Sequence, residues 1–143
     1  MGLNPLNFSD AFLGVMAQRL VRRLCPKCRQ EYQPNDEEFQ ELAEDYGKES
    51  FEATGIKYTD DLRLFKPVGC ETCSYTGYKG RMGIHELMEG TPIIKNMIKK
   101  SAPTDELLIQ ALKEGMTTLR QDGIMKVFQG LTDISEVRRV CVT

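Results

Sequence analysis

The chain has 143 residues, of which 41% are hydrophobic and 28% charged, as expected for one compact domain or two small subdomains. Its formal net charge of −2 argues against a general nucleic-acid binder, because such domains are usually strongly basic. No apolar run approaches the roughly 18 residues of a membrane-spanning helix. The sequence also lacks a GxxxxGK[ST] phosphate loop, a GxGxxG fingerprint and a Ser-His-Asp arrangement, so we expect no self-sufficient active site.

The first expected element is a helix over residues 6–24, which Asn7 or Ser9 can cap. Its apolar residues recur every four positions, and its arginines lie in the last turns, where cations favour the negative end of the helix dipole. The residues with this period are Phe12, Met16, Leu20 and Leu24, and Leu13 and Val21 join them on the same face. We interpret the three arginines as solvated: Arg19, Arg22 and Arg23.

Four of the five cysteines form two Cys-x-x-Cys pairs, Cys25 with Cys28 and Cys70 with Cys73. Two intervening residues let both sulfurs of a pair reach one ion from a tight turn, so the pairs predict a four-thiolate site for structural Zn²⁺. A site closed by four sulfurs has no position for water, and we expect no metal catalysis there. Iron held by the same cysteines and a redox dithiol remain as alternatives.

Several neighbours are expected to support this site. Four thiolates outweigh the charge of one Zn²⁺, and the cations nearest in sequence are Lys27, Arg29, Lys79 and Arg81. Backbone amides near Gly69 and Gly77 can donate hydrogen bonds to the sulfurs. We interpret His85 as a strand residue with ordinary hydrogen bonds, and Cys141 as a small apolar residue near the C-terminus.

Between the cysteine pairs the sequence predicts an acidic helix from Asp36 to Tyr46, with Asn35 and Glu38 as a capping box and Gly47 at its end. A short strand is expected over residues 63–68. After the second pair we expect a strand over residues 82–87 and then four short helices. Their boundaries are marked by Thr91-Pro92, Pro103-Thr104, Gly115, Thr117 or Thr118, Gly130, and Asp133 with Glu136. One helical core should unite Leu107, Leu108, Ala111, Leu112, Leu119, Met125, Phe128, Val137 and Val140.

Several motifs together resemble one family. Before and within the first cysteine pair the chain reads Ala17-Gln18-Arg19-Leu20-Val21-Arg22-Arg23-Leu24-Cys25-Pro26-Lys27-Cys28. From the second pair it reads Gly69-Cys70-Glu71-Thr72-Cys73, Thr76-Gly77-Tyr78-Lys79-Gly80-Arg81 and Gly83-Ile84-His85-Glu86-Leu87. The helical segment adds Gly115-Met116, Leu119, Asp122-Gly123, Lys126-Val127, Gly130-Leu131-Thr132, Glu136-Val137 and Arg139-Val140. In this order the motifs are similar to the C-terminal end of type II secretion and type IV pilus assembly ATPases.

The resemblance implies a parent that is a hexameric cytoplasmic ATPase, peripheral at the inner membrane, which moves pilus or pseudopilus subunits through a platform protein. ATP and Mg²⁺ would be bound only by the parent's core, upstream of Leu3. This chain would supply the last core helix (1–24), a four-cysteine zinc subdomain with an acidic helical insertion (25–80), and a C-terminal strand and helical subdomain (81–143). The expected fold is therefore mainly α with a small β element, a zinc subdomain followed by a short-helix bundle.

The implied role is mechanical: zinc would stiffen the subunit, which presents a surface to neighbouring ATPase subunits or the inner-membrane platform protein. The isolated chain is expected to be a monomer that binds no nucleic acid. One alternative is a stand-alone zinc ribbon that binds nucleic acid through basic residues near Cys25 and the segment from Tyr75 to Lys79. Another is a thiol-disulfide enzyme, which requires a reactive cysteine of low pKa.

Overall fold

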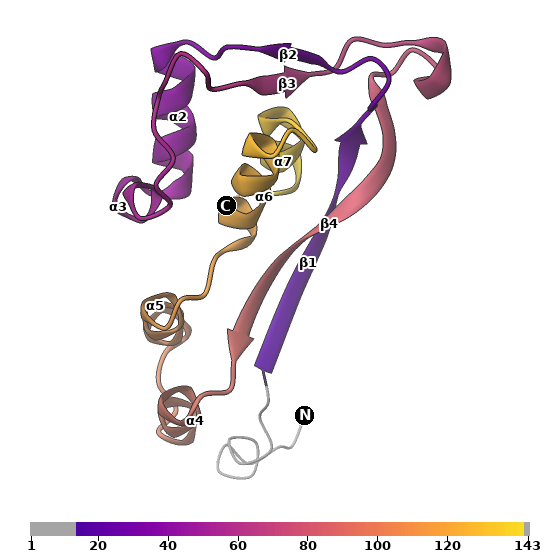
Figure 1. The fold of residues 1–143 in the computed structure, drawn as a ribbon. Helices are drawn as coiled ribbons and strands as arrows, with labels where there is room; N and C mark the ends of the chain where they lie inside the picture. The colour runs from indigo at the N-terminus through magenta and orange to yellow at the C-terminus, as the bar shows by residue number, and fades with distance from the viewer. Residues whose placement is uncertain (1–13, 142–143) are drawn as a thin grey trace. The chain divides into compact units, whose positions relative to one another are not determined.

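The computed structural model describes residues 14–141 (Figure 1). In chain order its elements are β1 (Gly14–Leu24), β2 (Gln30–Tyr32), α2 (Asp36–Tyr46), α3 (Lys48–Glu52), β3 (Leu64–Lys66), the 3₁₀ turn η1 (Glu71–Cys73), β4 (Tyr78–Glu89), α4 (Pro92–Lys99), α5 (Thr104–Lys113), α6 (Leu119–Phe128) and α7 (Ile134–Val140). The strands form two two-stranded sheets, β1 with β4 and β2 with β3. Within the described residues, this agrees with a mainly helical chain that has a small β element.

The strand β1 occupies residues for which we expected a helix, so the helix prediction is wrong over residues 14–24. Residues 6–13 lie outside the described part of the chain. The period of four is ambiguous, because Met16, Leu20 and Leu24 share a face in a strand as well as in a helix. Pairing with β4, antiparallel in Figure 1, decides between the two.

The chain divides into two compact units. The four-cysteine unit comprises Gln18–Ile84 and Leu119–Thr143, and the helical-pair unit comprises Met1–Ala17, described from residue 14, and His85–Thr118. Both β1 and β4 continue from one unit into the other along the chain. The predicted boundaries after residues 24 and 80 therefore do not coincide with these units.

The four-cysteine unit has a core made by both sheets and three helices. One buried cluster joins β1, β3 and β4 to α2, α6 and α7 through Val21, Leu42, Leu64, Ile84, Val127, Val137 and Cys141. A second cluster lies where α2 and α3 meet α6, and consists of Phe39, Ala43, Tyr46, Phe51 and Ile124. Its aromatic rings meet edge to face, with 5.4 Å between the centroids of Phe39 and Phe51. Both rings also meet the Phe128 ring of α6 edge to face, at 6.2 and 5.6 Å between centroids, which links the acidic insertion to that helix.

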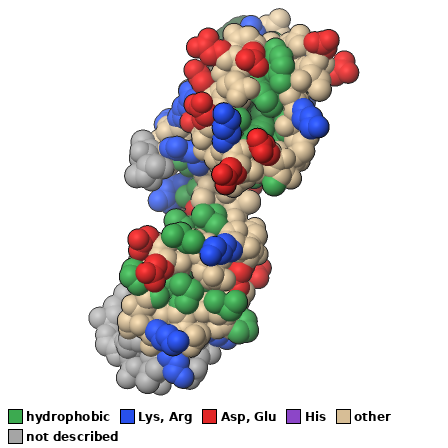
Figure 2. Space-filling model, turned by 90° about the vertical axis from the view of Figure 1, so that its left-hand side faces the viewer, with side chains coloured by type: hydrophobic (Ala, Val, Ile, Leu, Met, Phe, Trp, Pro, Cys, Tyr) green, Lys and Arg blue, Asp and Glu red, His purple; other side chains and the backbone are tan. Residues whose placement is uncertain are grey.

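The acidic helix α2 has the bounds that its caps predict. The Asn35 side chain accepts a hydrogen bond from the Glu38 amide at 2.8 Å, and Gly47 follows the helix with a φ of 105°. The Glu38 carboxylate accepts from the Tyr32 hydroxyl, and the second bond of the predicted capping box, from the Asn35 amide to Glu38, is not made. In the upper half of Figure 2, where α2 and α3 face the viewer, acidic side chains gather at the surface.

The helical-pair unit has a separate, smaller core. Ile94 of α4 and Ala111 of α5 are buried at its centre, and Thr91 caps α4 by accepting from the Ile94 amide at 3.3 Å. The partly buried residues around them are Met88, Met97, Ile98, Leu107 and Met116. In the lower half of Figure 2, where α4 and α5 face the viewer, hydrophobic side chains remain at the surface.

The four predicted C-terminal helices are present, but they do not share one core. Leu107 and Ala111 pack in the helical-pair unit, whereas Val137, Val140 and Phe128 pack in the four-cysteine unit. Of the remaining predicted core residues, Leu119 and Met125 pack in the four-cysteine unit. Leu108 and Leu112 are instead 39% and 38% exposed. The prediction of a single helical core is therefore wrong.

Candidate metal centre

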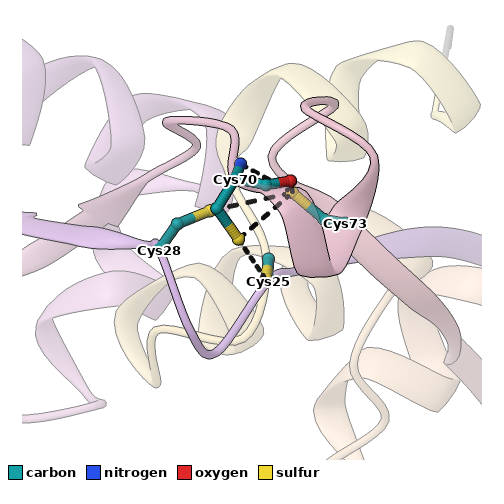
Figure 3. Close-up of side chains that lie close together, drawn as sticks. All are labelled: Cys25, Cys28, Cys70 and Cys73. Carbon is teal, nitrogen blue, oxygen red and sulfur yellow. Dashed lines mark hydrogen bonds between the residues drawn. The ribbon is translucent and has the colours of Figure 1, made fainter.

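The four predicted cysteines converge on one point, where their sulfurs face one another (Figure 3). All four Sγ atoms lie within 4.8 Å of one another, and three pairs are 3.8 Å apart: Cys25 with Cys70, Cys28 with Cys73, and Cys70 with Cys73. In a tetrahedral site with Zn–S bonds of about 2.3 Å, the sulfurs are about 3.8 Å apart. The sulfur positions thus fit a four-coordinate metal ion, while the presence and the identity of that ion stay predictions.

Each cysteine pair lies on a tight turn, and the two turns are joined. The first turn closes through the Arg29 amide, which donates to the Cys25 carbonyl at 2.9 Å. The second is η1, and the Tyr75 amide donates to the Cys70 carbonyl at 2.8 Å. The Cys25 amide also donates to the Gly77 carbonyl at 2.9 Å. This backbone hydrogen bond joins the residue after β1 to the residue before β4 at the site.

Backbone amides donate to two of the sulfurs, as predicted. The Gly69 amide lies 3.3 Å from Cys28 Sγ, and the Gly77 amide lies 3.2 Å from Cys73 Sγ. Gly77 has a φ of +84°, and a Cβ atom there would lie 2.5 Å from the Pro67 Cβ atom. Only glycine therefore fits at position 77 while its amide points at the sulfur.

The protein environment treats two of the thiols differently. Burial raises the pKa of the Cys28 thiol to about 11. Burial also disfavours the thiolate of Cys73, but amide hydrogen bonds from Cys70 and Gly77 outweigh it and lower the pKa to about 6. Because a metal ion binds thiolates, Cys73 is the better prepared of the two thiols for a metal ion.

The predicted neighbouring cations have different roles. Lys79 Nζ donates to the Thr72 carbonyl at 3.2 Å, within the second turn. Arg29 instead donates to the Gly130 carbonyl at 2.6 Å, and its guanidinium lies 4.3 Å from the centroid of the Phe65 ring. Arg29 therefore connects the first cysteine turn to the end of α6.

The single histidine and the fifth cysteine lie outside the sulfur cluster. His85 is in β4, as predicted, and is exposed. Cys141 is buried in the apolar core of the four-cysteine unit. Among the described residues, the group of cysteine, histidine and acidic side chains that could hold a metal consists of the four predicted cysteines.

Sequence reasoning missed a buried carboxylate in the four-cysteine unit. Glu136 of α7 is 1% exposed, and its Oε2 atom accepts from Arg22 Nη2 at 2.9 Å. Its Oε1 atom accepts from the Arg22 amide at 2.8 Å and from Arg139 Nη2 at 3.0 Å. Arg22 is therefore an ion-pair partner and not simply a solvated arginine.

Two further residues interact with this ion-pair group: Tyr78 of β4 and Asp133, the N-cap residue of α7. The Arg22 guanidinium lies 4.1 Å from the centroid of the Tyr78 ring, and the Tyr78 hydroxyl donates to Asp133 Oδ2. Asp133 Oδ1 accepts from the Glu136 amide at 2.9 Å, as its predicted capping role requires. The sequence marks Glu136 only as a capping-box partner, and its pairing with Arg22, 114 positions away, carries no local signal.

Electrostatics keep Glu136 ionised in spite of its burial. Burial alone would raise the pKa of its carboxyl group, but the hydrogen bonds from Arg22 and Arg139 lower it to about 2. The same pairing raises the pKa of both arginines. β1 and α7 are thus joined by a permanent charge pair.

The chain matches the model of a known protein family over nearly its whole length. The family model described as type II/IV secretion system protein matches residues 1–139. This chain belongs to that family. The resemblance inferred from the motifs is therefore confirmed.

Relatives within the type II/IV secretion family come from both of its branches. The chain is 42% identical over 137 residues to the type IV pilus assembly ATPase PilB of Thermus thermophilus, covering 96% of this chain and 14% of that protein. It is 42% identical over 141 residues to the type II secretion system protein E of Dickeya dadantii, covering 98% and 25%. The type II secretion system ATPase E of Vibrio cholerae is 36% identical over 140 residues, covering 98% and 25%. The chain thus spans a quarter or less of the length of these relatives.

Among the described residues of this family member, no helix has the length and apolar character needed to cross a membrane.

Proposed function

We propose that this chain is the non-catalytic C-terminal part of a hexameric secretion or pilus assembly ATPase, with a structural Zn²⁺ bound by Cys25, Cys28, Cys70 and Cys73. The bound ion would supply a fourfold crosslink between the two cysteine turns. It would stiffen the subunit, which presents a surface to neighbouring subunits or to the inner-membrane platform protein. ATP and Mg²⁺ would be bound by the rest of the motor, which would act in the cytoplasm at the inner membrane.

The observation that carries this proposal is the sulfur cluster in a member of this family. Three Sγ–Sγ distances of 3.8 Å match a tetrahedral zinc site. Sulfur occupies all four positions and leaves none for water, which supports a structural role over a catalytic one. The cluster also joins the end of β1 to the start of β4, so a metal there would hold the four-cysteine unit at its centre.

Metal analysis of the purified chain tests the zinc site. We expect one Zn²⁺ per chain, and less than about a tenth of that in Cys70→Ser, because loss of one thiolate opens the tetrahedral site. The matched control is Cys141→Ser, which changes a cysteine outside the cluster and should retain the metal. Iron in place of zinc, or full zinc occupancy in Cys70→Ser, would contradict the proposed site.

The non-catalytic role is tested separately by ATP hydrolysis. The chain has no GxxxxGK[ST] motif, which the phosphates of ATP require in such motors. We therefore expect no turnover above the rate of a buffer blank, with or without Mg²⁺. Turnover that persists after repeated purification and is absent from a mock preparation would overturn this part of the proposal.

A further inference from the structure

A groove of about 600 Å³ lies on the four-cysteine unit and is lined by three arginines. Arg22 comes from β1, Arg81 from β4 and Arg139 from α7, and Leu20 and Val21 complete the lining. A smaller hollow of about 230 Å³ shares Arg22 and Arg81 with the groove and adds Thr76, Tyr78 and Gly80. Cations from three separate elements thus meet around one open volume.

Two of these guanidinium groups are held in place before any ligand arrives. Arg22 and Arg139 both bind the buried carboxylate of Glu136, at 2.9 and 3.0 Å, and the Tyr78 ring supports Arg22 from one face. Their side chains are nevertheless 48% and 54% exposed. Each guanidinium has five N–H donors, so donors remain for a ligand after the bonds to Glu136 are made. A preorganised pair loses less conformational entropy on binding.

The third arginine has no acidic partner in the described part of the protein. Arg81 is exposed, and within residues 14–141 no acidic side chain lies within ion-pair distance of it. The three guanidinium groups carry three positive charges, and Glu136 and Asp133 carry the two negative charges that act on Arg22. The group therefore has a net charge of +1, with Glu136 turned into the protein and Asp133 bound to Tyr78.

We propose that this arginine groove, formed by Arg22, Arg81 and Arg139, is an anion-binding site for a phosphate group. The planar fork of arginine matches phosphate oxygens, and each charge-assisted hydrogen bond of this kind is about twice as strong as a neutral one. A phosphate group can accept from several guanidinium groups at once, which suits a groove walled by three of them. The apolar side chain of Leu20, which is 47% exposed, would face the part of the ligand that carries the phosphate.

Calorimetric titration of the full 143-residue chain with pyrophosphate tests the site. We expect Arg81→Gln to weaken binding by about tenfold to a hundredfold, the range for loss of a charge-assisted hydrogen bond. Because Arg81 has no ion-pair partner in the described structure, this change should leave the thermal midpoint within about 1 °C of the parent. The matched control is Arg23→Gln, which removes an exposed arginine from the same strand as Arg22 but not from the groove.

The source of the phosphate group is resolved by a second arm with vesicles. Sedimentation with phosphatidylglycerol vesicles that depends on Arg81, without pyrophosphate binding, would identify a lipid headgroup as the ligand. Pyrophosphate binding that depends on Arg81 would identify a free phosphate compound. If Arg81→Gln and Arg23→Gln weaken binding equally, or if the parent chain binds neither probe, the proposal is overturned.

Discussion

Glu136 illustrates how a single charged residue can be buried and still stabilise a fold. Its carboxylate is 1% exposed but accepts hydrogen bonds from two arginines and from the Arg22 amide. Removing one partner from a buried ion pair leaves the other partners unpaired, and this is usually more damaging than removing an exposed charge. The pair joins the first described strand to the last helix, so its loss should be felt across the unit.

We predict that Glu136→Gln lowers the free energy of unfolding at neutral pH by about 3 kcal/mol, because the amide cannot pair with Arg22 and Arg139 as the carboxylate does. The folded state lowers the pKa of Glu136 from 4.5 to about 2. Its stabilising contribution is therefore complete above pH 4.5 and lost as the pH falls through 2. Urea unfolding of both chains between pH 7 and pH 2.5 measures this, and the difference between them should shrink as the pH falls.

The matched control for this prediction is Glu41→Gln on the exposed face of α2, which should change the unfolding free energy by less than about 0.5 kcal/mol. A Glu136→Gln chain as stable as the control, or a difference that does not depend on pH, would contradict the structural account of Glu136.

The junction between η1 and β4 depends on backbone conformation as much as on side chains. Ser74 and Tyr75 both have positive φ angles, 56° and 65°, and Gly77 follows at 84°. Such conformations cost about 1–2 kcal/mol for residues other than glycine. They bring the Gly77 amide to Cys73 Sγ at 3.2 Å, so the turn is shaped around the sulfur.

At this junction we predict that Gly77→Ala destabilises the chain by at least about 2 kcal/mol more than Gly80→Ala. Both glycines have positive φ, +84° and +81°, but an added Cβ would lie 2.5 Å from the Pro67 Cβ at position 77 and have no neighbour within 4 Å at position 80. The difference between the two variants in urea unfolding isolates the clash from the backbone strain. Equal effects would mean that the chain at Pro67 yields to the methyl group.

Helices whose ends are marked by capping residues, glycine or proline could be predicted from the sequence. A strand that depends on pairing with a distant segment could not. Asn35 and Gly47 mark both ends of α2, and Thr91-Pro92 marks the start of α4. β1 has no such markers, and its apolar period of four fits a strand and a helix alike. Only its pairing with β4, more than fifty residues later, makes it a strand.

One part of the candidate sites could likewise be predicted from the sequence, and another part could not. The four cysteines and the amides of Gly69 and Gly77 follow from local spacing and turn chemistry, and the structure brings the sulfurs together as expected. The arginine groove could not be predicted, because Arg22, Arg81 and Arg139 meet only through the folding of β1, β4 and α7. Unlike the paired cysteines, these three arginines are not marked by any spacing motif that would predict their proximity from a single sequence.

For the molecule as a whole, we predict that metal removal affects the two units unequally. Each unit has its own buried cluster, and the cysteines belong only to one. Amide hydrogen exchange should therefore accelerate at least about tenfold in β2, β3 and the cysteine turns after chelation, because structural metal binding contributes folding free energy. The amides of α4 and α5 should change by less than about twofold.

The comparison of the chain with and without chelator carries its own control, because α4 and α5 serve as the internal reference. Equal acceleration in both units would mean that they unfold as one cooperative body. No acceleration in either would mean that the cysteine turns are held by their backbone hydrogen bonds without a metal.

Because the two cysteine turns are joined in space, we expect the folded unit to tolerate a break in the polypeptide between them. Residues 29–69 connect the two turns, and the longest exposed stretch within them runs from Lys57 to Asp61. A protease that cuts this stretch would produce two fragments, each carrying one cysteine pair and one strand of the β1–β4 sheet. The fragments would share the four cysteines of the cluster and both core clusters of the unit, so the nicked protein should migrate as one species until it is denatured. The peptide bond there is dispensable for holding the unit together once the chain has folded.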